Sequence, residues 1–262
     1  TVITAGYVDV YMGFWGTMYT ALRKTNQALY SLKNYGQMND EDKVRLEAEL
    51  RFLRANMYFD LIKRYKDVIL YDEDMASYTK NKAVSTEKEG WDLVQADLEF
   101  AAKNLPEKAA AKGRIDKGMA CAFTTRAMLY AKRYDAVIAA ANDVEKLGYR
   151  LEANYEDAFK KPINGGNNEA ILQYAFSYAD GVTHSMDFYY TPAGDYTLIG
   201  QEAGGGGYGT PTQEMVESYE LATGGFPDWS EWHNADGTTA TPPYADLEPR
   251  FHATVLYNGA EW

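Results

Sequence analysis

The chain is organised around residues 42 to 70, DKVRLEAELRFLRANMYFDLIKRYKDVIL. At helical spacing this stretch carries two apolar rows, which are Leu46, Leu50, Leu53, Met57 and Leu61, and Ala48, Phe52, Ala55, Phe59 and Ile62. The rows lie on nearly opposite sides of the helix, whereas a surface helix needs only one apolar stripe. We therefore expect a central helix packed between neighbours, with Leu53 and Phe59 buried against different helices.

Helical periodicity also extends on both sides of this stretch. Apolar residues recur every three or four positions between residues 8 and about 33. Thr86 and Glu89 have the spacing of a capping box at the start of a further helix. Asp116 can cap the helix after that, and another helix begins near Tyr134.

The character of the sequence changes after Gly148. Residues 149 to 210 are rich in Tyr, Gly and Asn and have no helical period. The segment EAILQYAFS, residues 169 to 177, has the composition of a short strand. Thr210 and Gln213 have the spacing of the cap and the third position of a short helix.

These patterns together predict a mainly α fold with little β structure. We expect stacked antiparallel helical hairpins over residues 1 to 148. We expect residues 149 to 262 to be a loop-rich region that faces the ligand and packs on the helices.

Composition excludes several classes of function. The formal net charge of −12 disfavours nucleic acids and anionic membrane surfaces, because binding to both depends on basic clusters. No run of 18 apolar residues is present, so no membrane-spanning helix is expected.

Residues with catalytic or metal-binding chemistry are sparse. The single cysteine, Cys121, excludes a disulfide framework and a cysteine-type zinc site. The three His residues have no ligand spacing, and no nucleophile motif occurs. The segment GGGGYG, residues 204 to 209, lacks the ending of a phosphate-binding loop and is expected to be a flexible loop. We predict a protein that is not an enzyme and has neither a cofactor nor a bound metal.

Aromatic residues are the strongest binding signal, since the chain has 22 Tyr beside 10 Phe and 5 Trp. An aromatic ring can take the C–H face of a sugar while nearby polar groups take its hydroxyls. We predict ligand-binding residues Trp229, Trp232, Tyr208 and Tyr196, because all four lie in expected loops. Two alternatives stay open: the rings cover the helical stack, or the two Trp pack against another protein or another part of a longer chain.

The central stretch resembles the E-x-R-x-L-R-A-x-x-Y-F-x-L-x-x-x-Y-G-D-V-P-L segment of the SusD/RagB family. Residues that match include Glu49, Arg51, Arg54, Tyr58 and Asp67, while Lys66 stands where Gly is usual and Ile69 where Pro is usual. Three further segments, WDLVQADLEFAAKNLP, PTQEMVESYELATGG and LEPRFHATVLYNG, also resemble family patterns.

This resemblance implies helices packed like tetratricopeptide repeats in a surface protein of Bacteroidetes-type bacteria. It further implies a lipid-anchored protein on the extracellular face of the outer membrane, whose anchor is absent from this chain. Such a protein captures oligosaccharides and passes them to a SusC-like TonB-dependent transporter. The alternatives are a peptide-capture protein of the same family and a helical-repeat scaffold with protein partners alone.

The ends of the chain also carry an expectation. The sequence begins at Thr1 without an initiator Met, a signal peptide or a lipidation cysteine, and it ends at Trp262 directly after an apolar run. We therefore expect it to be the middle of a longer protein.

Overall fold

The structure, a computed structural model, describes residues 13–74, 76, 78, 81–109, 111, 113–161, 166–177, 179–192, 206–230, 242–257, 259 and 260. The chain forms two compact units. The first comprises residues 1–150 and 170–173, and the second comprises residues 151–169 and 174–262.

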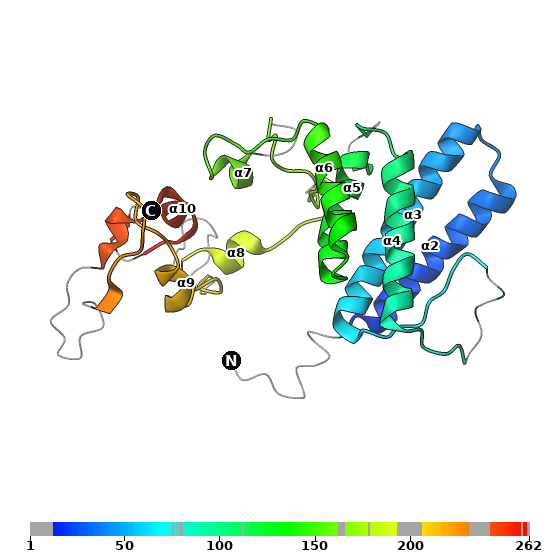
Figure 1. Cartoon of the computed structure of the whole chain (residues 1–262), viewed down its shortest axis with the longest axis horizontal. Helices are drawn as coiled ribbons and strands as arrows, with labels where there is room; N and C mark the ends of the chain where they lie inside the picture. Colours follow the sequence, from blue (N-terminus) through cyan, green and yellow to red (C-terminus); the bar gives the residue numbers. More distant parts are fainter. Residues whose placement is uncertain are drawn as a thin grey trace. The chain divides into compact units, whose positions relative to one another are not determined.

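The first unit is a row of long helices. They are α2 (Trp15–Tyr35), α3 (Asp40–Tyr65), α4 (Glu87–Asn104), α5 (Lys117–Tyr130) and α6 (Tyr134–Lys146). Each helix packs along the next one in the chain, which gives consecutive antiparallel hairpins (Figure 1). The expected mainly α fold of stacked hairpins is confirmed, and α3 contacts both α2 and α4 as a central helix should.

Local capping sets where these helices begin. Asn39 accepts a hydrogen bond from the Asp42 N–H at the start of α3. Thr86 and Glu89 form the predicted capping box of α4. The side chain of Asp116 accepts from the N–H of Met119 and caps α5, as predicted.

The two apolar rows of α3 are buried to different extents. Phe59 is 4% exposed, and its ring centroid lies 5.3 Å from that of Phe123 on α5. Leu53 is 41% exposed and lines a hollow of about 580 Å³ beside α2. The prediction that both rows are buried is therefore wrong for Leu53, because the hollow separates its end of the row from α2. Farther along the same row, Leu61 is buried.

The turn at the end of α3 has an unusual backbone conformation. Lys66 has φ 61° and ψ −82°, a backbone conformation that suits Gly. Its N–H still donates to the carbonyl of Ile62 and closes the last turn at 2.8 Å. Lys66 therefore adopts this turn at a conformational cost.

A buried polar network fixes the segment that follows α3. Asn26 on α2 donates its amide to the carbonyl of Tyr71 at 3.0 Å and accepts from Nη1 of Arg54 at 3.0 Å. The same Nη1 lies 2.8 Å from the carboxylate of Glu73. Because Asn26 and Arg54 are buried, this network holds residues 71 to 73 against α2 and α3.

The described helices of the second unit are short. They are α7 (Asp157–Lys160), α8 (Met186–Tyr190), α9 (Gln213–Glu217), the 3-10 helix η5 (Pro243–Asp246) and α10 (Pro249–Thr254). Within the described residues the only β pairing is in isolated bridges, such as Ser177 with Val182, so the strand predicted over residues 169 to 177 is wrong. The cap of α9 is Thr212, which accepts from the N–H of Met215, and not Thr210 as predicted.

Candidate ligand-binding surface

Trp229 does not lie on the surface. It is 8% exposed and belongs to the small core of the second unit, where its ring centroid lies 6.2 Å from that of Tyr244. Tyr244 in turn stacks on Phe251 at 5.6 Å, with 18° between the ring planes. The expectation of an exposed Trp229 ring is therefore wrong, since residues that follow it in the chain supply an apolar core to cover it.

The other three predicted residues have different outcomes. Trp232 and Tyr196 lie outside the described residues. Tyr208 is 72% exposed, as expected for a residue that offers its ring to a ligand. Its role in binding stays a prediction.

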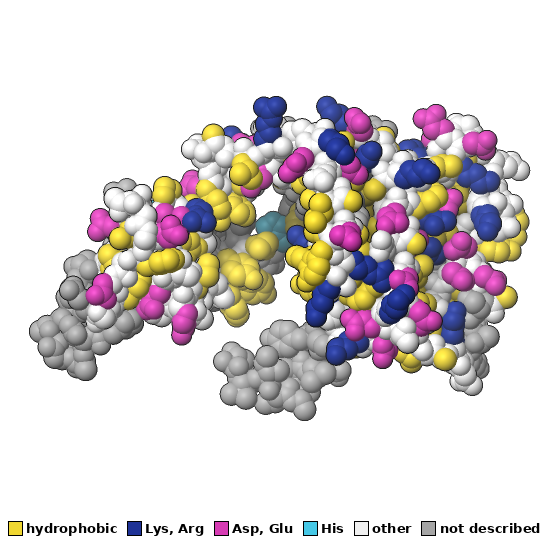
Figure 2. Space-filling model, in the orientation of Figure 1, with side chains coloured by type: hydrophobic (Ala, Val, Ile, Leu, Met, Phe, Trp, Pro, Cys, Tyr) yellow, Lys and Arg dark blue, Asp and Glu magenta, His cyan; other side chains and the backbone are white. Residues whose placement is uncertain are grey.

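Tyr208 is joined by two further exposed tyrosines. Tyr189 and Tyr190 end α8, and hydrophobic side chains gather on the surface over this helix (Figure 2). The ring centroids of Tyr189 and Tyr208 lie 5.2 Å apart, and their planes meet at 76°. We call Tyr189, Tyr190 and Tyr208 the tyrosine cluster. The sequence alone does not bring these residues together, because they belong to two segments that are distant in the sequence.

Backbone hydrogen bonds hold the tyrosine cluster in place. The N–H of Tyr208 donates to the carbonyl of Tyr189 at 3.1 Å, and the N–H of Gly207 donates to that of Thr191 at 2.8 Å. Gly209 lies directly under Tyr190, since a Cβ there would be 2.7 Å from Cδ1 of that ring. The rings are thus positioned before any ligand arrives, which lowers the entropy lost on binding.

A second group of exposed rings lies elsewhere in the second unit. Phe176 contacts Tyr174 at 5.0 Å and His184 at 4.6 Å between ring centroids. Between Phe176 and His184 in the sequence, the backbones of Ser177 and Val182 form two hydrogen bonds with each other and close a small turn. These rings offer apolar surface but are not among the residues predicted to bind ligand.

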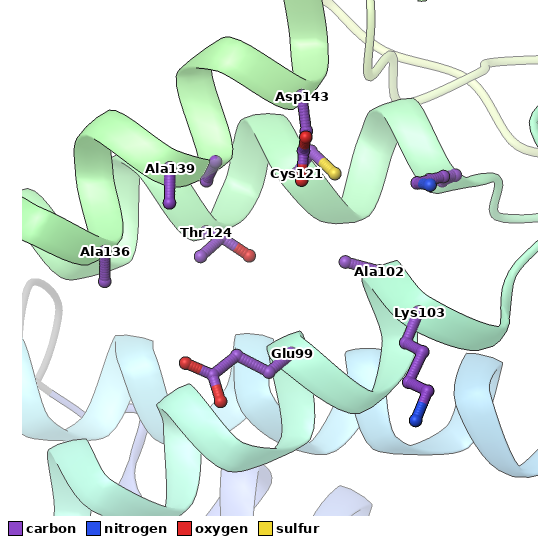
Figure 3. A pocket seen from close by; sticks show the side chains of 10 residues that line it. Glu99, Ala102, Lys103, Cys121, Thr124, Ala136, Ala139 and Asp143 are labelled. Atoms are coloured by element: carbon purple, nitrogen blue, oxygen red, sulfur yellow. The ribbon is translucent and has the colours of Figure 1, made fainter.

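A cavity of about 250 Å³ lies in the first unit, between α4, α5 and α6 (Figure 3). It is lined by the small side chains of Cys121, Ala136 and Ala139 and by the charged side chains of Glu99, Lys103, Lys117 and Asp143. Burial raises the pKa of the Cys121 thiol, and the negative charge of Asp143 adds to this effect. A thiol held in its neutral form is a poor nucleophile and a poor metal ligand.

The described part of the chain contains no cluster of three or more His, Cys, Asp or Glu side chains that could hold a metal ion. No described helix is both long and apolar enough to cross a bilayer. Exposed tyrosine rings can stack on a ligand, and their hydroxyls can form hydrogen bonds with it.

Comparison with protein families gives two matches along the chain. Residues 3–129 match the model described as starch-binding associating with outer membrane. Residues 168–262, which include Tyr189 and Tyr208, match the model of the SusD family. The two matches do not overlap and together cover most of the sequence.

Individual relatives agree with these matches. SusD-like protein P2 of Formosa agariphila is 25% identical over 253 residues, which are 90% of this chain and 47% of that protein. The solved structure of a SusD-like protein from Bacteroides fragilis has a TM-score of 0.74 and 31% identity, and the match covers 91% of this chain and 48% of that one. The chain thus spans about half the length of these two relatives.

A further similar structure was determined with xylogluco-oligosaccharide. It has a TM-score of 0.53 and is 26% identical. The match covers 63% of this chain and 35% of that protein.

Proposed function

This chain belongs to the SusD/RagB family, and we propose that it binds oligosaccharides without chemically altering them. The observation that carries the proposal is the tyrosine cluster, because its exposed rings lie within the segment that matches the SusD family model. The relative bound to xylogluco-oligosaccharide supports a sugar as the class of ligand.

The rings set the expected strength of binding. Stacking contributes about 0.5–1.5 kcal/mol per ring, by analogy with aromatic pairs. A few such contacts give a free energy near −4 kcal/mol, which corresponds to a Kd of about 1 mM. Weak binding suits a protein that passes its ligand on.

We further propose that the full-length protein is lipid-anchored on the extracellular face of the outer membrane and delivers sugars to a SusC-like TonB-dependent transporter. The family description of association with the outer membrane supports this location. Purification of the full-length protein from outer membranes in mild detergent should yield a complex with a TonB-dependent barrel. A protein that elutes free of any barrel would contradict the transporter proposal.

A glycan array followed by calorimetry tests the binding proposal. We expect at least one oligosaccharide to bind and Tyr208→Ala to weaken that binding. Tyr35→Ala is the matched control, because Tyr35 is 70% exposed but lies on α2 in the other unit. Trp232→Ala and Tyr196→Ala extend the panel to the other proposed ligand residues.

A peptide array run beside the glycan array separates the alternatives. A chain that binds peptides and no sugars would be a peptide-capture protein, and a chain that binds neither would favour a scaffold. Chromatography of the bound sugar after long incubation should return it intact. Shortened products would show that the protein is an enzyme.

A further inference from the structure

The cavity of the first unit is bounded by small side chains from three helices. It has a volume of about 250 Å³, and α4 and α6, which both pack on α5, contribute to its walls. Figure 3 shows the methyl groups of Ala102, Ala136 and Ala139 directed into this space. Because these positions hold alanine, α4 and α6 leave a gap where larger side chains would interdigitate in a close-packed interior.

The uncharged part of the lining offers water few hydrogen-bond partners. The Cys121 thiol is 1% exposed and forms no disulfide, and no hydrogen bond to its sulfur is found among the described residues. Burial raises the pKa of this thiol, which keeps it neutral. The hydroxyl of Thr124 already donates to the carbonyl of Ala120 at 2.8 Å. Water in such a cavity is therefore readily displaced by an apolar ligand.

The charged side chains that line the cavity balance one another. They are two carboxylates and two amines, from Glu99, Asp143, Lys103 and Lys117. Asp143 forms an ion pair with Lys146 at 2.8 Å, and the charge of Lys117 also attracts it. Glu99 accepts a hydrogen bond from the side-chain amide of Gln95 at 2.7 Å. A charged ligand would thus lose its hydration without a matching excess of opposite charge, so the lining favours an uncharged ligand.

We propose that this cavity binds a small uncharged aromatic molecule of the size of benzene or indole. An apolar cavity of about 150 Å³ is enough to bind benzene, and the cavity here is larger. A flat ring suits a gap between two helices, where the Cys121 sulfur packs against it as a small apolar group. The site lies in the first unit, so it is independent of the oligosaccharide binding proposed for the second.

Titration of the whole chain with indole tests the proposal. Indole should raise the melting temperature in a dose-dependent way, because it binds the folded state. Ala102→Leu places a larger side chain in the cavity and should weaken indole binding by about tenfold or more in calorimetry. Ala96→Leu is the matched control, since Ala96 is exposed on the same helix and does not line the cavity. Ala139→Leu fills the cavity from α6 and provides a second test.

Chemical labelling gives a readout that needs no substitution. Cys121 is the single cysteine of the chain, so the mass gained with methyl methanethiosulfonate reports on this residue alone. Saturating indole should slow that labelling several-fold. The proposal fails if indole neither raises the melting temperature nor slows the labelling. It also fails if a folded Ala102→Leu or Ala139→Leu variant binds indole as tightly as the natural chain. If circular dichroism shows both variants to be unfolded, protection of Cys121 in the natural chain decides.

Discussion

Arg54 on α3 and Asp97 on α4 form a buried ion pair with two parallel hydrogen bonds. Nε of Arg54 lies 2.7 Å from Oδ2 of Asp97, and Nη2 lies 2.8 Å from Oδ1. Both side chains are at most 3% exposed. Burial raises the pKa of Asp97, while the hydrogen bonds from Arg54 oppose that rise. The geometry matches the planar fork of a guanidinium to a carboxylate, so we assign Asp97 the charged form.

Removing one partner of this pair should destabilise the first unit strongly. Arg54→Met removes both hydrogen bonds to the buried Asp97 and leaves it only the more distant cation of Arg51, at 3.7 Å. We expect a loss of about 3–5 kcal/mol in the free energy of unfolding. Arg54→Met combined with Asp97→Leu removes both charges and should lose less than Arg54→Met alone. Urea unfolding measures both, and Lys146→Met, which breaks the exposed pair with Asp143, should change stability far less than Arg54→Met does. A double variant less stable than the single one would contradict this account.

The two rows of α3 should respond differently to truncation. Phe59 packs among the rings of Trp91, Phe123 and Tyr130, so Phe59→Ala should lower the free energy of unfolding by about 3–5 kcal/mol. Leu53→Ala should lose less than about 1 kcal/mol, because much of that side chain is already in water. Equal losses in urea unfolding would show that the hollow beside Leu53 is filled in solution.

Stability should fall at alkaline pH because of Tyr19. Its hydroxyl donates to the carbonyl of Ile69 and accepts from the N–H of the same residue. Burial raises the pKa of Tyr19 from 10.0 to about 12, so the folded state favours the neutral phenol. Its contribution to stability is complete below pH 10 and is lost as pH rises to about 12.

Comparison with Tyr19→Phe isolates this contribution. The variant lacks the titrating group, so its free energy of unfolding should fall less than that of the natural chain over the same pH range. Tyrosines and lysines that do not interact with Tyr19 titrate alike in both proteins and cancel in the difference, whereas the charges of Tyr58 and Tyr71 interact with that of Tyr19. Parallel pH dependence in the two proteins would rule out Tyr19 as the cause.

The sequence predicted the helices of the first unit well because their signals are local. Apolar spacing and the caps at Thr86 and Asp116 lie within a few residues of the structure they specify. The pairing of Arg54 with Asp97 was missed, since it joins positions 43 residues apart. Arg54 and Asp97 each lie among apolar residues of their helix. A charged side chain in such a position is buried only with a partner, and this was the available signal.

The candidate site was predicted less well for the same reason. Exposure of Tyr208 follows from its Gly-rich surroundings, whereas its contact with Tyr189 joins positions that are distant in the sequence. Trp229 was placed on the surface because its neighbours have loop composition. Its burial depends on Tyr244, Phe251 and Tyr257, which follow later in the chain.

Replacing Lys66 should stabilise the protein. At φ 61° and ψ −82°, a side chain is strained whereas Gly is not. We expect Lys66→Gly to raise the free energy of unfolding by about 1 kcal/mol, after allowing for the greater freedom of Gly in the unfolded chain. Lys66→Ala retains the Cβ and should bring no such gain. Equal stability of the Gly and Ala variants in urea would mean that the turn relaxes without strain.

Gly206 lets the tyrosine cluster form, because only Gly fits so close to the backbone of Thr191 and Pro192. Gly206→Ala would place a Cβ 2.4 Å from the carbonyl oxygen of Thr191 and 2.6 Å from that of Pro192. Both are backbone atoms, so the loop must move, and Tyr208 should leave its position beside Tyr189. Oligosaccharide affinity should then drop about as far as in Tyr208→Ala, and hydrogen exchange should quicken at the N–H groups of residues 207 and 208.

Gly224→Ala is the matched control for Gly206→Ala. Gly224 has φ 89°, against 90° for Gly206, but no atom lies within 4 Å of the position its Cβ would take. The two variants therefore carry a similar backbone strain, and only one of them carries the clash. If Gly206→Ala binds sugar as the natural chain does, the pairing of the loop with α8 does not position the binding rings. If Gly224→Ala loses as much affinity as Gly206→Ala, general strain in the second unit and not the clash explains the effect.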